Sequence, residues 1–145
     1  MTASDPEPEQ RRLFVAIELP AAITRALQAC QRRLRRSGAR VRWTRPEGIH
    51  LTLAFLGETP MDRIGHIRDA MAAASSDAFP LRLEVRGLGF LGSTRAPRVV
   101  WAGVRGETTE LSALRRRLAA ELRAAGFELD DRPFRPHLTL GRVQI

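Results

Sequence analysis

The sequence predicts an α+β protein that contains two related copies of a strand–helix–strand motif. Its apolar residues alternate in some segments and recur every three or four residues in others, which are the periods of strands and helices. The segment His50–Ala54 reads His-Leu-Thr-Leu followed by a small residue, and this pattern returns at His137–Gly141. The two segments are 87 residues apart, and the sequence around them repeats at the same spacing. We therefore predict an internal duplication.

The first copy is expected to contain three strands and one helix. Alternating apolar residues predict the strands, at residues 11–19, 41–44 and 49–56. The helix is expected to start after Pro20 and to end near Gly38, since proline suits a first helical turn and glycine suits a C-terminal cap. Its predicted apolar stripe comprises Ile23, Leu27, Cys30 and Leu34.

A further helix and strand separate the two copies. Thr59 and Asp62 have the spacing of a capping box, which predicts the start of a helix. The apolar stripe of this helix comprises Ile64, Ile67, Met71 and Ala74. The strand expected next, at residues 81–91, contains Gly87 and Gly89, so we expect a bulge or a bend in it.

The second copy repeats the order strand, helix, strand. Apolar alternation predicts strands at residues 98–104 and 136–143, and residues 92–97 are expected to form a polar loop. A stripe of leucines predicts the clearest helix of the chain, which is expected to end at Gly126. The members of the stripe are Leu111, Leu114, Leu118 and Leu122.

The direction of each side chain in the motif strands follows from alternation, because residues i and i+2 of a strand share one face. His50 and Thr52 are therefore expected to point to one side of their strand. Leu51, Leu53 and Phe55 are expected to point into the core. The second motif repeats this pattern with its own histidine, threonine and two leucines.

Two imidazoles that face one ligand supply a general base and a general acid near neutral pH. We expect His50 and His137 to be this pair. The hydroxyls of Thr52 and Thr139 suit the oxygens of a tetrahedral phosphodiester, to which they donate hydrogen bonds. The duplicated motif therefore predicts one functional site with two halves.

Arg142 follows the second motif and is a candidate phosphate clamp, because a guanidinium donates two parallel hydrogen bonds. Strict alternation places it on the leucine face of the strand, unless Gly141 allows a bulge. Neither motif contains a cysteine or a carboxylate that would complete a metal site, so we expect no metal and no cofactor.

The composition is that of a globular protein with a basic surface. The net charge is +8, which favours a polyanionic partner, although the 24 basic residues are all arginines and a compositional bias is an alternative cause. No apolar run approaches the ~20 residues of a membrane span. The acidic start of the chain lacks the pattern of a secretory signal, so a cytoplasmic location is expected. The single cysteine, Cys30, is expected to be a buried apolar residue, and His66 to lie at the surface or at its boundary with the core.

In combination, these motifs resemble those of a known family. The chain opens with Arg12–Ile17, carries Trp43 before the first motif and ends with the run Phe134–Arg142. It thereby resembles the RNA 2′,3′-cyclic phosphodiesterases, also called 2′-5′ RNA ligase-like proteins, of the two-histidine phosphoesterase superfamily. The resemblance extends over residues 12–143, which is nearly the whole chain.

The resemblance implies a bilobal fold in which two antiparallel sheets flank a central basic cleft, with the helices on the outside. This fold would form a single domain at residues 11–145, preceded by a flexible segment at residues 1–10. Members of the family continue beyond the second motif, so the second copy is expected to be short at its C-terminal end. A monomer is expected, and a dimer that covers an open strand edge is the alternative.

The resemblance also implies metal-independent hydrolysis of a terminal 2′,3′-cyclic phosphate to a 2′-phosphate, with 2′-5′ ligation as the reverse reaction. In this reaction His50 would donate a proton to the leaving 3′ oxygen and His137 would activate water. Thr52 and Thr139 would bind the phosphate. The partner would be an RNA end, for example that of a tRNA fragment, and no membrane would take part.

Several alternatives stay open from the sequence. Phe14 and Trp101 are candidates for stacking on a base, with a position in the core as the alternative for both. The same chemistry could act on a small cyclic nucleotide or on a cyclic phosphate of ADP-ribose. A non-catalytic module that binds RNA through its basic surface is the third hypothesis.

Overall fold

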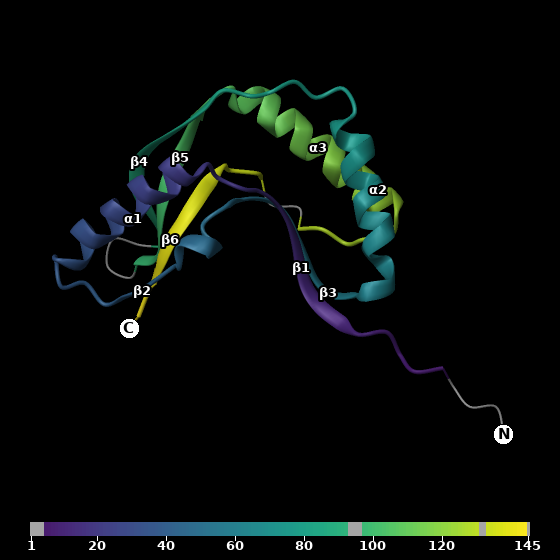
Figure 1. Ribbon diagram of the computed structural model, residues 1–145, viewed down its shortest axis with the longest axis horizontal. Helices are drawn as coiled ribbons and strands as arrows, with labels where there is room; N and C mark the ends of the chain where they lie inside the picture. The colour runs from purple at the N-terminus through teal and green to yellow at the C-terminus, as the bar shows by residue number, and fades with distance from the viewer. Residues whose placement is uncertain (1–4, 93–96, 131–132, 145) are drawn as a thin grey trace. The chain divides into compact units, whose positions relative to one another are not determined.

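The computed structural model describes residues 5–92, 97–130 and 133–144. Its helices and strands follow the predicted order, in which strand–helix–strand occurs three times (Figure 1). Short 3₁₀ turns at Pro46–Gly48 and Met61–Arg63 lie before and after β3. The elements are β1 (Gln10–Ile17), α1 (Ala21–Arg35), β2 (Val41–Trp43), β3 (Leu51–Pro60), α2 (Ile64–Ser75), β4 (Leu83–Gly92), β5 (Pro97–Gly106), α3 (Thr108–Ala124) and β6 (His137–Val143).

The strands form two antiparallel sheets, as predicted. One pairs β1 with β3, and the other has the order β2-β6-β5-β4. The chain divides into two compact units, each of which collects three segments of sequence. The first unit comprises Met1–Val15, Leu53–Pro80 and Thr109–Pro133, and the second comprises Ala16–Thr52, Leu81–Thr108 and Phe134–Ile145.

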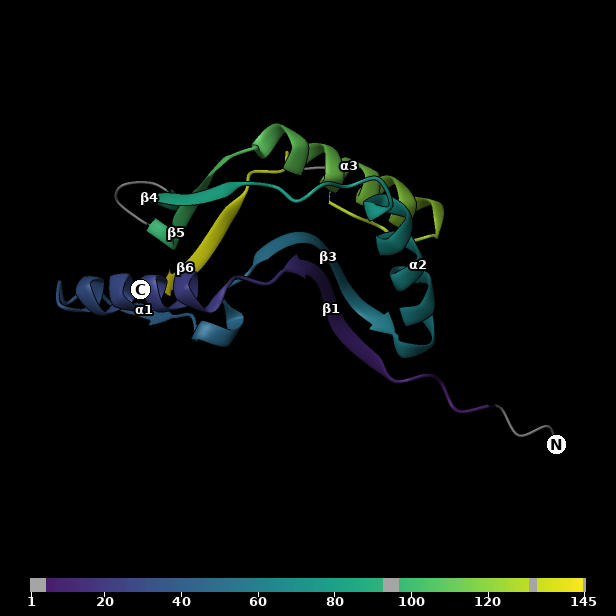
Figure 2. The same ribbon diagram turned by 45° about the horizontal axis from the view of Figure 1, so that its top comes forward.

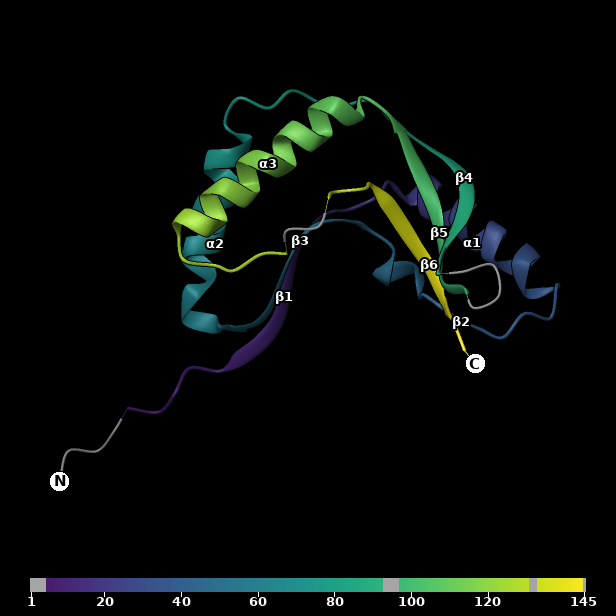
Figure 3. The same ribbon diagram turned by 180° about the vertical axis from the view of Figure 1, so that it is seen from behind.

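The second unit is built on the four-stranded sheet. Figures 1 and 3 view the sheet from opposite sides and show α1 against one of its faces. Leu138 and Leu140 of β6 are fully buried, and Ala102 of β5 is nearly so. Because successive residues of a strand point to opposite faces, these apolar residues give the sheet a covered face.

A buried glutamine joins α1 to the sheet. Gln31 is 5% exposed, and its side-chain Nε2 donates to the carbonyl oxygens of Thr44 at 2.9 Å and Leu140 at 3.0 Å. The sequence predicted the apolar stripe of this helix, of which Leu27 is buried and Cys30 is half-buried. It did not indicate Gln31, since a glutamine on a core face requires partners that periodicity does not reveal.

The first unit packs α2 and α3 side by side (Figures 1 and 2). Arg117 of α3 donates from Nε to the carbonyl oxygen of Ala74 in α2, at 3.1 Å. Arg63 donates to the carbonyl oxygen of Ala125 just after α3, and its guanidinium carbon lies 4.5 Å from the centroid of the Phe127 ring. The arginine thus satisfies a carbonyl at a helix end and packs on an aromatic ring.

The predicted breaks in the elements are largely confirmed. Gly38 and Gly126 follow α1 and α3 with φ of 78° and 94°, as expected of residues that end helices. The ladder between β4 and β5 shifts register between Val85 and Leu88, where the sequence predicted a bulge or a bend. The strand predicted at residues 49–56 instead begins at Leu51, so that His50 precedes it, and it continues to Pro60.

The predicted capping box is wrong. Thr59 lies inside β3 and is 2% exposed, and its hydroxyl donates to the carbonyl oxygen of Gly57 at 3.0 Å. The residue that precedes α2 is Arg63, which makes no side-chain capping bond. The local spacing predicted a helix start at Thr59, but this residue instead continues β3, where its side chain is buried.

Parts of two predicted segments lie outside the described residues. Residues 1–4 of the predicted N-terminal segment are not described, and residues 5–9 precede β1 without helix or strand. Within the polar loop predicted at residues 92–97, residues 93–96 are not described. None of the helices seen in the described residues has the length and apolarity needed to cross a bilayer.

Replacing Gln31 by alanine should destabilise the second unit. The substitution leaves the carbonyl of Thr44 without its side-chain donor and removes one of the two donors to Leu140. We expect a loss of about 1–3 kcal/mol in the free energy of unfolding, measured by urea denaturation. The matched control is Arg32→Ala on the exposed side of the same helix. Equal midpoints for the two variants would contradict the role given to Gln31.

Candidate functional site

The second motif lies on β6, where its polar and apolar residues separate onto the two faces of the sheet. Leu138 and Leu140 are fully buried, whereas His137 and Thr139 are partly exposed. We call the face that carries His137 and Thr139 the open face. The burial pattern confirms the prediction that leucines anchor this strand from behind.

A register shift between β5 and β6 changes the alternation after Thr139. Trp101 pairs with Thr139, but Val100 pairs with Gly141, so Leu140 is an extra residue in β6. Trp101 and Val100 are successive residues of β5, so they point to opposite faces of the sheet. Their partners Thr139 and Gly141 therefore also lie on opposite faces, although they are two residues apart. Arg142 therefore returns to the open face, and the sequence-based alternative of a bulge at Gly141 describes the strand correctly.

Gly141 is required by the close approach of β2. A Cβ atom at this position would lie 2.5 Å from Cγ1 of Val41 and 3.1 Å from both the carbonyl oxygen of Arg42 and Cε3 of Trp43. Real side chains do not tolerate the first of these distances without a shift of the backbone or of the valine. The glycine thus lets β2 pack against the bulge.

His137 is held by a carbonyl and an indole. Its Nδ1 lies 2.7 Å from the carbonyl oxygen of Arg135, which can only accept, so Nδ1 carries the hydrogen. The Trp101 ring meets the imidazole edge-on, with 6.5 Å between ring centroids. Opposite Trp101, Gly89 leaves room for the indole, since a Cβ there would overlap its ring. In the neutral imidazole, Nε2 is therefore the basic nitrogen.

His50 has a different neighbour. It directly precedes β3 and lies between two buried residues, Ile49 and Leu51. Its Nδ1 is 3.2 Å from Oγ1 of Thr52, a hydroxyl that either donates or accepts. The Thr52 hydroxyl therefore does not fix the tautomer of the His50 ring, whereas the carbonyl at His137 does fix that of its ring.

The second compact unit contains the His-x-Thr part of both motifs. His50 and Thr52 close its first segment, and the segment from Phe134 to Ile145 contains the second motif. The open-face residues of β6 lie beside Trp101, which the sequence left undecided between the core and a base-stacking role. Trp101 is half-buried, and its ring lies against His137.

Phe14 and Phe55 form an exposed aromatic pair in the first unit. Their ring centroids are 6.3 Å apart, and they are 47% and 71% exposed. The prediction that Phe55 points into the core is wrong, because Leu53 and Ala54 are both buried and the alternation breaks between them. Phe14 is likewise not a core residue. The structure therefore adds Phe55 as a partner of Phe14, which periodicity alone could not find.

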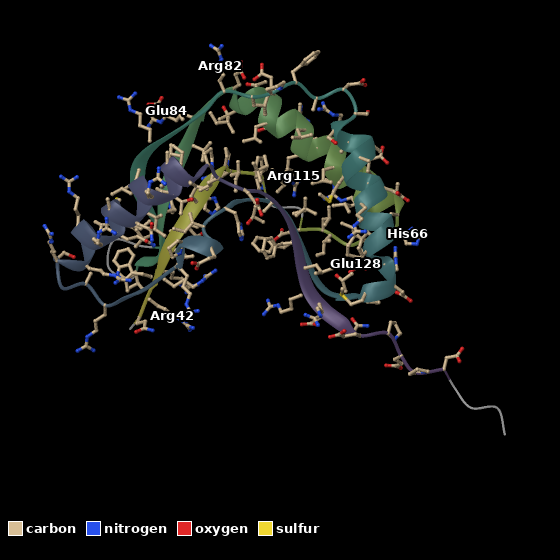
Figure 4. All side chains as sticks on the ribbon, in the orientation of Figure 1. Arg42, His66, Arg82, Glu84, Arg115 and Glu128 are labelled. Carbon is tan, nitrogen blue, oxygen red and sulfur yellow. The ribbon has the colours of Figure 1, made fainter. Side chains whose placement is uncertain are left out.

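The third histidine, His66, belongs to neither motif. His66 is exposed on α2, as predicted (Figure 4), and lines a shallow groove of the first unit with Asp69 and Glu121. Within the described residues, we find no group of three or more histidine, cysteine or acidic side chains placed to hold a metal ion.

Comparison with known proteins identifies relatives of most of the chain. The family model described as LigT like phosphoesterase matches residues 17–101 and 103–144. An RNA 2′,3′-cyclic phosphodiesterase of Geobacillus stearothermophilus is 42% identical over 100 residues, and one of Archaeoglobus fulgidus is 34% identical over 134 residues. The crystal structure of E. coli LigT complexed with 3′-AMP is 31% identical, with a TM-score of 0.72.

The aligned regions cover different shares of these proteins. They span 69% of this chain and 32% of the Geobacillus protein, and 92% of this chain and 73% of the Archaeoglobus protein. The match to E. coli LigT covers 92% of this chain and 74% of that structure. Both histidine motifs fall inside the residues that the family model matches.

The hydrogen bond to Arg135 predicts the tautomer of His137. Nitrogen-15 NMR at a pH where the imidazoles are neutral should show His137 mainly with its hydrogen on Nδ1, because the carbonyl of Arg135 accepts that hydrogen. Exposed His66 is the internal reference, and it should favour Nε2–H, as a solvated histidine side chain does. A dominant Nε2–H form at His137 would show that the Arg135 carbonyl does not determine which ring nitrogen carries the hydrogen.

Proposed function

We propose that this chain, which belongs to the LigT like phosphoesterase family, hydrolyses RNA-terminal 2′,3′-cyclic phosphate to a 2′-phosphomonoester. The observation that carries the proposal is the presence of two His-x-Thr segments, His50–Thr52 and His137–Thr139, in one compact unit. The names of the curated relatives, RNA 2′,3′-cyclic phosphodiesterase, support the same reaction.

We infer that the fold arose by duplication, as the sequence repeat predicts. The strand pairings support this inference, because β3 pairs with β1 and β6 pairs with β5. Each motif strand is therefore the neighbour of the strand that opens its own copy. In both copies a helix, α1 or α3, connects this opening strand toward the motif.

His137 is the general base of the proposed reaction. Its Nδ1–H donates to the Arg135 carbonyl, which leaves the Nε2 lone pair free to take a proton from water. The carbonyl also stabilises the imidazolium that forms, since the Nδ1–H bond to it strengthens when the ring becomes charged. The family resemblance assigns the same role to this residue.

His50 is the general acid. In its charged form both ring nitrogens carry a hydrogen, so Nδ1–H donates to Thr52 Oγ1, and we propose Nε2–H as the donor to the leaving group. The Thr52 hydroxyl, having accepted this bond, directs its own hydrogen elsewhere, and a phosphate oxygen is the acceptor we propose. The acid and one phosphate contact are thereby coupled.

Thr139 and Arg142 complete the phosphate contacts on β6. Within the described residues, the Thr139 hydroxyl makes no hydrogen bond, so it is available to a ligand on the open face. Arg142 shares that face because of the bulge, and its guanidinium would balance the charge of the phosphate. Phe14, which is exposed beside Phe55, is our candidate for stacking on a base.

The proposed step balances with water as the only co-reactant. A water oxygen forms a bond to phosphorus while His137 Nε2 takes one of its protons, and the bond from phosphorus to the 3′ oxygen breaks. His50 Nε2 donates a proton to that oxygen, which leaves a 3′ hydroxyl and a 2′-phosphate. Exchange with solvent then restores both histidines. If the 5′ hydroxyl of a second RNA took the place of water, the same two proton transfers would form a 2′-5′ phosphodiester and release the 3′ hydroxyl. The protein acts as a monomer in this scheme.

Alanine at either motif histidine should abolish hydrolysis. His50→Ala and His137→Ala each remove a proton-transfer group, which should lower kcat by about 10²- to 10⁴-fold on an RNA that ends in a 2′,3′-cyclic phosphate. Both side chains are partly exposed, so the unfolding midpoint should change little. Chromatographic product analysis and urea denaturation measure the two effects.

The control is His66→Ala, which removes the third histidine without touching either motif. This variant should keep the full rate. Full activity in either motif variant would contradict the proposed function. A loss of activity that is fully explained by unfolding of the variant would contradict it as well.

Since the two histidines supply both proton transfers, the proposed step needs no metal. Treatment with EDTA followed by gel filtration should therefore leave the rate of cyclic-phosphate hydrolysis unchanged. The same preparation assayed with added Mg²⁺, Mn²⁺ or Zn²⁺ is the comparison. A rate that falls with EDTA and returns with one of these ions would rule out the metal-independent scheme.

A further inference from the structure

We propose that Arg42 binds the internucleotide phosphate that precedes the cyclic end of an RNA, with Arg142 shared between this phosphate and the cyclic one. The proposal rests on the proposed function, because it takes the cyclic phosphate to bind beside His137 and Thr139. It adds a substrate class, since it makes an oligoribonucleotide a better ligand than a cyclic mononucleotide.

The register of the sheet brings Arg42 to the open face. Arg42 on β2, which is labelled in Figure 4, is the direct partner of Arg142 on β6. Partners in an antiparallel pair point to the same side of the sheet. The bulge already places Arg142 on the side of Thr139. On β2, Val41 and Trp43 point the other way, because they line the position that a Cβ of Gly141 would occupy.

Arg42 and Arg142 are directly paired across the two strands, so their positive charges repel each other. A bound anion would offset this repulsion. Like charges on directly paired strand residues are destabilising. In the described part of the chain, Arg11 is paired with Glu9, whereas no carboxylate pairs with Arg42 or Arg142. Both guanidiniums are exposed, so a ligand can reach them. A phosphate between them would receive hydrogen bonds from two planar donors.

The pair is held in place by the covered side of the sheet. The backbone N–H of Thr44 donates to the carbonyl oxygen of Leu140 at 2.9 Å, and Gln31 bonds both of these residues from α1. Gly141 packs against β2 on the same side. Arg42 and Arg142 therefore stand on a fixed pair of strands, which favours a binding role over chance proximity.

The position of the pair along β6 suits a second phosphate. Thr139 and Arg142 pair with Trp101 and Val99, which are two residues apart on β5. The bulge therefore leaves them separated by about 7 Å along the sheet. A phosphate held at Thr139 is therefore separated from Arg42 by more than its own width. The cyclic phosphate is at the 3′ end of the RNA, so the neighbouring phosphate is the one that links the last two nucleotides.

The test is a binding cycle that removes either the arginine or the charge of that phosphate. The ligand is a fluorescent diribonucleotide that ends in a 2′-phosphate, which the protein cannot hydrolyse further. The second ligand is the same molecule with an uncharged methylphosphonate between its nucleotides. Affinities are measured by fluorescence anisotropy for the wild type, for Arg42→Ala and for Arg33→Ala, which removes an exposed arginine from α1.

We expect Arg42→Ala to weaken binding of the charged ligand by about threefold to tenfold. The slope of log affinity against log salt should become shallower by about 0.7, as for one lost phosphate contact on a single strand. The methylphosphonate should weaken binding to the wild type by a similar factor, and to Arg42→Ala hardly at all. Arg42→Lys should lie between the two, and Arg33→Ala should match the wild type.

Independent, multiplying effects of the substitution and the methylphosphonate would overturn the proposal, as would unchanged affinity in Arg42→Ala. Hydrolysis of a cyclic mononucleotide by Arg42→Ala should equal that of the wild type. The binding cycle involves no turnover, so it tests Arg42 separately from the proposed reaction. Failure of the reaction would be seen in the wild type, on every cyclic phosphate.

Discussion

The break in the alternation of β6 at Gly141 is the constraint on which the candidate site depends. A regular strand would place His137 and Thr139 on one face and Arg142 on the other. The extra residue, Leu140, stays buried while Arg142 moves to the open face. The break is tolerated because residue 141 has no side chain, which lets Val41 and Trp43 pack against it. Gly141 thus allows β2 to pack closely against β6, and the resulting register places Arg42 and Arg142 on the same face of the sheet.

The two motifs have the same sequence, and the segments that lead into them explain why their histidines differ. Pro136 restricts the residue before it to extended conformations, and the carbonyl of Arg135 accepts the Nδ1 hydrogen of His137. The first motif instead follows a 3₁₀ turn, and His50 meets the hydroxyl of Thr52. The carbonyl fixes the tautomer of His137, whereas the hydroxyl at His50 can donate or accept. The asymmetry therefore comes from the surroundings and not from the motif.

The sequence predicted the order of elements and the buried leucines, because both depend on periodicity, which a long strand or helix displays clearly. It could not predict Gln31 or Arg42, whose roles depend on which strand lies beside β6. Thr59 and Phe55 were misassigned for a related reason. Each follows a local rule, capping spacing or strand alternation, which burial elsewhere in the fold overrides. Pairing between distant segments is what the residues alone do not reveal.

The central claim is that water attacks phosphorus while the 3′ oxygen leaves. The most direct test is hydrolysis of an RNA with a 2′,3′-cyclic phosphate end in ¹⁸O-labelled water, with the product examined by ³¹P NMR and mass spectrometry. The account predicts a 2′-phosphate that carries one labelled oxygen on phosphorus, next to an unlabelled 3′ hydroxyl. A 3′-phosphate product, or label in the sugar hydroxyl, would contradict it.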